Sequence, residues 1–312
     1  MQVKIDTPAV ERFIDSQLAE WQLAAKNFAA LDGVKVKTLD VDGMPIKVQF
    51  NPARIVSSGA KVDAKAVAAR PCFLCAANRP SEQSGLDWHE RYTVLVNPFP
   101  IFPRHLTVPD TSHVDQRIAG RMADMLSLAA DLPGYTVFYN GPRCGASAPD
   151  HMHFQAGNSD FLTLGDFVAA AELRTVKESD GARLSVADSL PLKFFVIDAA
   201  KPESGAAMFE RLLRAMPVQE GDAEPMMNIL AYATADGTRA VVVPRKRHRP
   251  SFYGDGSGDT MMISPASVDM GGVFITPLEK DFERLDAALV KKIFDELCLS
   301  KNEINEIASD VK

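Results

Sequence analysis

The run Asn140-Gly-Pro-Arg-Cys-Gly-Ala-Ser-Ala-Pro-Asp-His-Met-His-Phe-Gln155 passes from a loop of small residues into a stretch of alternating polar and apolar residues. In an extended strand every second side chain points to the same side of the sheet. A strand over residues 151–156 therefore places three polar side chains on one face: His151, His153 and Gln155. Met152 and Phe154, which lie between them, are then predicted to enter the core.

This polar face and the loop before it favour phosphate chemistry. Imidazole is a good nucleophile toward phosphorus near neutral pH, because its ordinary pKa is about 6.5. Gly145 and Ser147 lie in a loop whose small side chains let backbone N–H groups approach a phosphate closely. The alternative interpretation is two half-buried structural histidines on a sheet. The Gly-x-Ser loop and the following glutamine favour the phosphate site.

The rest of the N-terminal half combines helices with antiparallel strands. Residues 7–31 have a helical apolar period, and residues 34–50 form two alternating segments around Asp42-Gly43, which predicts a hairpin with a type I′ turn. Short strands are predicted over 93–97, 106–108 and 135–140, and a helix over 113–132.

The C-terminal half repeats this style. Strands are predicted over 192–197, 227–233, 239–243 and 273–276, and helices over 206–216 and most of 281–309; residues 253–259 are too rich in glycine for regular structure. Because strands and helices do not alternate strictly, the sequence predicts an α+β fold with antiparallel sheet. We expect two halves, residues 1–180 and 181–312. The order strand, turn, strand, Pro-Arg occurs in both and gives a faint internal repeat.

Composition excludes several classes of protein. The chain has 312 residues, 34 Lys and Arg against 41 Asp and Glu, and a net charge of −7, so nucleic acid and membrane surfaces are not expected partners. The N-terminus lacks the apolar run of a signal peptide, and no stretch reaches the roughly 18 apolar residues of a membrane span. Four cysteines in a chain of this length fit a reduced compartment. These features favour a cytoplasmic protein.

Three segments resemble the transferase branch of the histidine-triad superfamily. Residues 151–156 look like the active-site strand of GDP-hexose phosphorylases, and are similar to that of galactose-1-phosphate uridylyltransferases and diadenosine tetraphosphate phosphorylases. Residues 97–105 resemble the Asn-x-Phe-Pro segment and following His of the phosphorylases, and residues 49–54 resemble a Gln-x-Asn-x-x-Arg segment of GDP-hexose phosphorylases. The resemblance implies a duplicated histidine-triad-like architecture. One departure is Asp150, which stands between Pro149 and the first histidine.

By this resemblance His153 would be the nucleophile, with Gln155 bonded to the transferred phosphoryl group and His151 as the other triad residue. The resemblance and the loop together give further expected substrate-binding residues: Gln49, Asn51, Arg54, Asn97, Arg104, His105, Asn140, Gly145 and Ser147.

Cys72-Phe-Leu-Cys75 resembles the motif that opens the zinc site of some uridylyltransferases. Zinc in a structural site takes four thiolate or imidazole ligands. The resemblance supplies His113 and His151 as the second pair. The alternative is two buried free thiols.

Residues 244–250 form a basic segment in an acidic protein. Its cationic side chains could bind pyrophosphate, free phosphate or a sugar phosphate, the expected residues being Arg245, Lys246, Arg247 and His248. The alternative is a solvated basic loop.

These features together predict a nucleotidyltransferase or phosphorylase that forms a covalent nucleotidyl-histidine. Its donor would be a nucleoside diphosphate sugar or a dinucleoside polyphosphate, and its acceptor phosphate or a sugar phosphate. A homodimer is a further expectation. The alternatives are a hydrolase of the same superfamily and a nucleotide-binding protein without catalysis.

Overall fold

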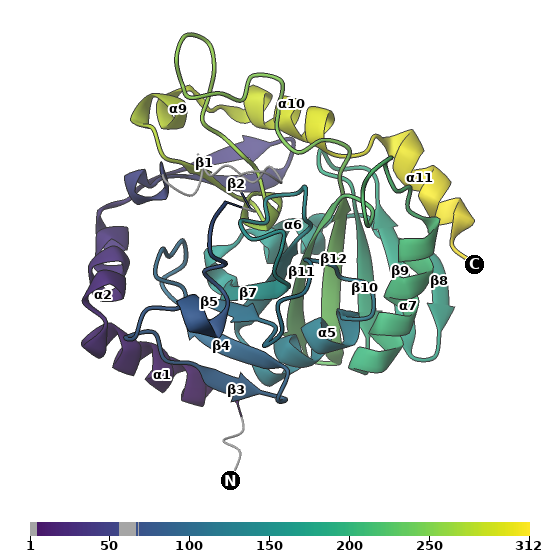
Figure 1. Cartoon of the computed structure of the whole chain (residues 1–312). Helices are drawn as coiled ribbons and strands as arrows, with labels where there is room; N and C mark the ends of the chain where they lie inside the picture. Colours follow the sequence, from purple (N-terminus) through teal and green to yellow (C-terminus); the bar gives the residue numbers. More distant parts are fainter. Residues whose placement is uncertain (1–4, 56–66, 68) are drawn as a thin grey trace.

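The fold is built on one large antiparallel sheet (Figure 1). The computed structural model describes residues 5–55, 67 and 69–312. In these residues ten strands hydrogen-bond side by side. In spatial order they are β3 (Leu86–Trp88), β4 (Tyr92–Val96), β5 (His105–Pro109), β7 (His153–Asn158), β6 (Tyr135–Asn140), β11 (Met227–Thr234), β12 (Gly237–Pro244), β10 (Phe194–Ala199), β9 (Ala182–Ala187) and β8 (Arg174–Ser179). The predicted α+β class is confirmed.

Strands β3 to β7 lie side by side, as do β8 to β12, and the two groups join where β6 pairs with β11. The sheet is therefore continuous across the two halves. The expected boundary at residue 180 lies in the turn of the hairpin β8–β9, where Asp180 and Gly181 both have positive φ. This hairpin, which was not predicted from the sequence, lies at one edge of the large sheet, next to β10.

A smaller sheet links the two halves again. The predicted hairpin is confirmed as β1 (Lys35–Val41) and β2 (Met44–Phe50), and the φ values of 51° at Asp42 and 86° at Gly43 fit the predicted type I′ turn. Strand β13 (Val273–Thr276) adds to β2 in parallel. Residues more than 220 positions apart therefore form one layer.

Helices and the small sheet cover the two faces of the large sheet. One face packs against α1 (Thr7–Glu20), α2 (Gln22–Ala29), α5 (Met122–Asp131), α7 (Pro202–Ala215) and α11 (Lys301–Asp310). The other face packs against the small sheet, α6 (Leu164–Ala170), α8 (Ser267–Met270), α9 (Glu279–Arg284) and α10 (Ala287–Leu297). The single-turn helices are η1 (Ala30–Gly33), η2 (Pro52–Arg54), η3 (Ala76–Asn78) and η4 (Ser159–Phe161). Phe154 and Ala156 of β7 belong to the first core, so the intervening residues of β7 face the second layer.

Three predicted helices are shorter than expected, for local reasons. The helix over 7–31 breaks at the extended residue Trp21. Residues 113–121 are not helical, because the N–H of Gln116 donates to Pro149 and the carbonyl of Val114 accepts from Met152. The segment 281–309 divides where Asp286 and Ser300 cap new helices.

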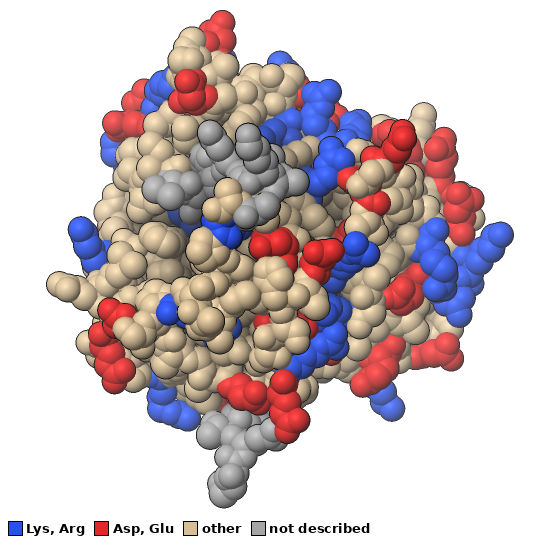
Figure 2. All heavy atoms as spheres, viewed as in Figure 1, with Lys and Arg blue, Asp and Glu red and all other residues tan. Residues whose placement is uncertain are grey.

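No helix in the described part of the chain is long and apolar enough to cross a membrane. On the face shown in Figure 2, acidic and basic side chains are interspersed.

Candidate active site

A cavity of about 620 Å³ lies at the end of β7, on the side covered by the small sheet and α8. Both halves of the chain line it. The N-terminal half supplies polar side chains that the sequence predicted: Asn97, Asn140, Ser147, His153 and Gln155. The C-terminal half supplies His248, Arg249, Ser264 and Asp269.

His153 is the first residue of β7, and its side chain is buried at the cavity wall. Its Nδ1 lies 2.7 Å from the carbonyl oxygen of His151. A carbonyl only accepts hydrogen bonds, so Nδ1 carries the proton and Nε2 carries the lone pair. Nε2 has no hydrogen-bond partner within residues 5–55, 67 and 69–312. Burial lowers the pKa of His153 to about 4, so the ring is neutral at pH 7.

The orientation of Gln155 follows from its neighbours. The N–H of Ile101 donates to Nδ1 of His105 at 3.0 Å, so the His105 proton is on Nε2. That Nε2–H donates to Oε1 of Gln155 at 3.0 Å, and Asn97 Nδ2 lies 3.4 Å from the same oxygen. The amide oxygen is thus held by the protein, and the amide nitrogen is the group left to donate into the cavity.

His105 and Asn97 therefore both contact the amide oxygen of Gln155. His105 is fully buried, and burial lowers its pKa to about 3, so it stays neutral. Of these two, Asn97 also lines the cavity.

The loop between β6 and β7 packs tightly against the C-terminal half. Asn228 Nδ2 and the Ser267 N–H both donate to Oδ1 of Asn140, at 3.0 and 2.8 Å, so the Asn140 amide nitrogen is oriented as a donor. Gly145 has φ +99°, and a Cβ there would lie 2.5 Å from the Cβ of Ala266. Only glycine fits this approach. Gly145 and the exposed Ser147 line the cavity.

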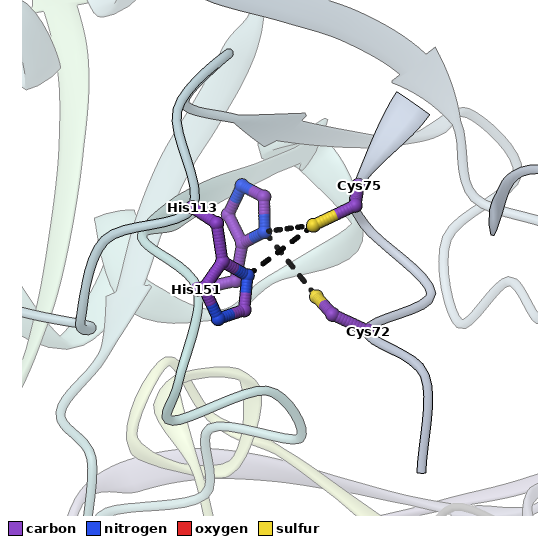
Figure 3. Close-up of side chains that lie close together, drawn as sticks. All are labelled: Cys72, Cys75, His113 and His151. Carbon is purple, nitrogen blue, oxygen red and sulfur yellow. Dashed lines mark hydrogen bonds between the residues drawn. The ribbon is translucent and has the colours of Figure 1, made fainter. Parts of the chain in front are cut away.

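His151 lies before β7 and does not share the face of His153 and Gln155. The interpretation of three alternating side chains is therefore wrong for this residue. The cause is local: residues 149–152 pair their backbone with residues 110–116 instead of forming a strand. His151 points to the two cysteines (Figure 3).

Cys72, Cys75, His113 and His151 form one cluster, in which the four ligand atoms lie within 4.8 Å of one another. Cys72 Sγ is 3.2 Å from His151 Nδ1, and Cys75 Sγ is 3.2 Å from His113 Nδ1 and 3.6 Å from His151 Nδ1. The Nε2–H of His151 donates to the carbonyl oxygen of Asp110 at 2.8 Å, which leaves the Nδ1 lone pair facing the sulfurs. The cluster has the donor set of a tetrahedral metal site.

The basic segment is largely outside the cavity, contrary to expectation. Arg245 is buried and donates to Asn228 Oδ1 and to three carbonyl oxygens, at Pro265, Arg247 and His248. Lys246 and Arg247 pair with Glu303 and Glu296, at 3.7 and 3.5 Å. Among the residues predicted from this segment, only His248 lines the cavity.

The remaining predicted binding residues are divided. Arg104 pairs with Glu11 and Asp15 away from the cavity. Arg54 lines the cavity and donates to the Phe99 carbonyl at 2.7 Å, and burial lowers its pKa to about 10. Gln49 and Asn51, which precede Arg54 in the sequence, are buried and do not line the cavity. Gln49 Oε1 and Asn51 Nδ2 have no hydrogen-bond partner among the described residues.

Several lining residues were missed by the sequence analysis. Arg249 stacks on Tyr253, 4.0 Å from the ring centroid, and donates to Ser264 Oγ at 2.9 Å. Asp269 is buried, which raises its pKa to about 7. The apolar side of the cavity comes from separate segments, and includes Trp21, Leu23, Phe73 and Phe99. No local pattern marks these residues, because they gather only in the folded chain.

Comparisons with known proteins find one family model and several solved structures that match this chain. A family model described as a domain of unknown function, DUF4922, matches residues 13–158. A search of curated proteins found no match.

Solved structures of yeast Ap4A phosphorylase Apa2 share the fold. One matches with a TM-score of 0.58 and 19% identity, covering 89% of this chain and 94% of the yeast chain. The structure of its AMP complex matches with a TM-score of 0.58 and 20% identity, covering 91% of this chain and 97% of the yeast chain. The structure of its Ap4A complex matches with a TM-score of 0.55 and 18% identity, covering 90% of this chain and 97% of the yeast chain. The likeness spans both halves of the chain. The chain therefore shares the fold of yeast Ap4A phosphorylase Apa2.

Proposed function

We propose that this protein is a nucleotidyltransferase of the phosphorylase type, with His153 as the nucleophile. The observation that carries the proposal is the geometry of His153. Its imidazole is neutral, its Nδ1–H donates to the His151 carbonyl, and its Nε2 lies at a cavity wall with no partner among the described residues. The shared fold with Ap4A phosphorylase supports a nucleotide substrate. We assign each part of the proposed reaction to residues of this chain.

In the first step Nε2 of His153 attacks the α-phosphorus of the donor. The new P–N bond forms as the bond from phosphorus to the bridging oxygen breaks, and the leaving group departs with that electron pair. The imidazole becomes positively charged while it keeps its Nδ1 proton, and the His151 carbonyl accepts a hydrogen bond from that proton. No base has to remove a proton from the nucleophile.

Donors around the cavity would hold the phosphoryl oxygens. The amide nitrogens of Gln155 and Asn140 and the Gly145–Ser147 loop surround one end, and Arg249 extends the positive charge. Positioning and charge neutralisation are the main requirements of phosphoryl transfer. The apolar side, with Trp21, Leu23 and Phe99, suits a nucleobase.

In the second step an acceptor oxygen attacks phosphorus and the P–N bond breaks, which regenerates neutral His153. Inorganic phosphate or a sugar phosphate is the proposed acceptor, and a dinucleoside polyphosphate or a nucleoside diphosphate sugar the proposed donor. Two half-reactions through one covalent enzyme give ping-pong kinetics.

The function is tested by incubating the protein with Ap4A, and separately with a GDP-hexose, each radiolabelled at the α-phosphate. We expect one of them to give an acid-labile, base-stable protein adduct that added phosphate discharges as a labelled nucleoside diphosphate. Discharge by buffer alone, at a rate that phosphate does not change, would indicate a hydrolase. Binding of both nucleotides without any adduct would indicate a non-catalytic binding protein.

We further propose that the Cys72, Cys75, His113 and His151 cluster holds a structural zinc ion. The sulfur-to-nitrogen distances of 3.2, 3.2 and 3.6 Å are close to the edges of about 3.5 Å of a tetrahedron with ordinary zinc bond lengths. Zinc there would join the loop at Cys72 to the residues that precede β7. All four ligands would be supplied by this chain, so the site would be closed and structural rather than catalytic.

Elemental analysis of the purified, untagged protein is expected to find about one zinc per chain. Cys75→Ser should reduce this content, since it removes one thiolate ligand. Cys298→Ala is the matched control, because Cys298 is a free thiol buried away from the cluster, against Met270. Metal-free wild-type protein, or equal zinc in both variants, would contradict the proposal.

A further inference from the structure

The strands β6 and β7 separate at the end that carries His153. Their ladder runs from Tyr135↔Asn158 to Phe138↔Gln155 and stops there. Two residues farther along, Asn140 pairs with Asn228 of β11 and His153 pairs with Pro109 of β5. The strands that flank the active site are therefore each held on their outer sides, and their facing backbone groups need other partners.

The side chain of Gln116 occupies this gap. Its Nε2 donates to the carbonyl oxygens of Asn140, at 3.0 Å, and His153, at 3.1 Å, and its Oε1 accepts the N–H of His153 at 2.8 Å. Both N–H groups of the amide and its oxygen therefore bond to the backbone of these two residues. Gln116 is fully buried.

Gln116 is itself fixed by its surroundings. Its backbone N–H donates to Pro149 at 3.1 Å, and two residues later the N–H of Ile118 donates to Glu224 at 2.8 Å. Glu224 also accepts from the hydroxyl of Tyr139, at 2.5 Å, so it connects this segment to β6. The amide is thus held rigidly against both strands.

We propose that Gln116 is a positioning residue for the His153 nucleophile, an inference that rests on the proposed function. The Gln116 amide bonds to both the N–H and the carbonyl of His153 and so fixes the backbone of that residue. The position of the His153 imidazole relative to the cavity follows from this backbone position. Gln116 also fixes Asn140, whose amide nitrogen is oriented as a donor. A displacement of about 1 Å at a reacting group can cost up to about 10²-fold in rate.

The test is the rate of adduct formation in Gln116→Met, which has a similar shape but makes no such hydrogen bonds. With α-labelled Ap4A and GDP-hexose as probes, we expect labelling about 10- to 100-fold slower than in the wild type. The dissociation constant of the same nucleotide should change by less than about threefold, because Gln116 does not line the cavity.

Gln17→Met is the matched control. Gln17 is also a buried glutamine whose amide bridges backbone groups, at Glu82 and Ser84, both at 3.1 Å. Its loss should lower the melting temperature but not the labelling rate. Equal slowing in the two variants would reduce Gln116 to a stabilising role and overturn the inference.

Gln116→Glu gives a second, independent readout. A protonated glutamic acid can accept from the His153 N–H and donate to one of the two carbonyls, whereas the carboxylate can only accept. We therefore expect the ratio of variant to wild-type labelling rate to rise as the pH is lowered. Taking the ratio cancels the titration of groups present in both proteins, such as Glu224, His151 and His153.

The outcomes separate this inference from the function on which it rests. A wild-type protein that forms no adduct overturns the proposed function, and this inference with it. A wild type that is labelled, with Gln116→Met labelled at the same rate, overturns only the role of Gln116. If Gln116→Met does not fold, the test is the ratio of the Gln116→Glu labelling rate to that of the wild type. A ratio that does not change with pH overturns the inference.

Discussion

Replacing His153 by alanine is expected to abolish the nucleotidyl adduct and to reduce turnover by at least about 10⁴-fold. Nε2 of His153 lies at the cavity wall and has no hydrogen-bond partner in the part of the chain that the structure describes. His105 also lies close, but its two ring nitrogens are bonded to Ile101 and Gln155. Without Nε2 the P–N bond of the proposed intermediate cannot form at this position.

Nucleotide binding should largely persist in His153→Ala, because the proposed contacts to phosphate and base come from other residues. The measurement is labelling with the α-labelled nucleotide beside a dissociation constant for the same compound. His89→Asn is a suitable control: it removes a histidine that stacks on Trp88, outside the cavity, and asparagine tolerates the positive φ of 55° at this position. His153→Ala protein that is labelled and turns over at the wild-type rate would rule out the mechanism.

The difference between His153 and His151 shows what alternation in sequence can and cannot predict. The pattern correctly placed Met152 and Phe154 in the core, and it placed His153 and Gln155 at one cavity. It failed for His151, since the strand begins at His153. The backbone of residues 149–152 pairs with residues 110–116, which are distant in sequence, and nothing in the local pattern reports this pairing.

The basic segment shows a second limit. A run of cations is ordinarily exposed, yet Arg245 is buried because Asn228 and three carbonyl oxygens surround its guanidinium. Those acceptors come from β11 and from loops at 247–248 and 265. Charge alone could not separate this structural arginine from Arg249, which does line the cavity.

Local signals predicted most individual elements, but not their assembly. The type I′ hairpin depends on residues 42 and 43 alone, and β13 was predicted at its observed bounds. The joining of the halves through β6 and β11, and the parallel addition of β13 to β2, depend on contacts between residues about 90 and 230 positions apart. Gln116 belongs to the same class, because an isolated glutamine carries no sequence signal for a bridge between two strands.

The second large effect is expected at Gln155. If its amide nitrogen donates to charge that develops on the phosphoryl oxygens, Gln155→Ala should still form the adduct, but by up to about 10²- to 10³-fold more slowly. The orientation of the Gln155 amide is the reason for this expectation. His105 Nε2–H and Asn97 Nδ2 both approach Oε1, so the nitrogen is the end that faces the cavity.

Gln155→Glu separates this donor role from simple loss of volume. The glutamate keeps an oxygen for His105, at the position 3.0 Å away, but presents a second oxygen where the amide nitrogen stood. An anionic oxygen beside a phosphoryl group repels it, so Gln155→Glu should be slower than Gln155→Ala although it is closer in shape. The measurement is the labelling rate of both variants. Gln219→Ala is the control, because it removes an exposed amide that donates to the Lys246 carbonyl. Gln155→Glu labelled as fast as the wild type would show that the amide does not donate to the phosphoryl group.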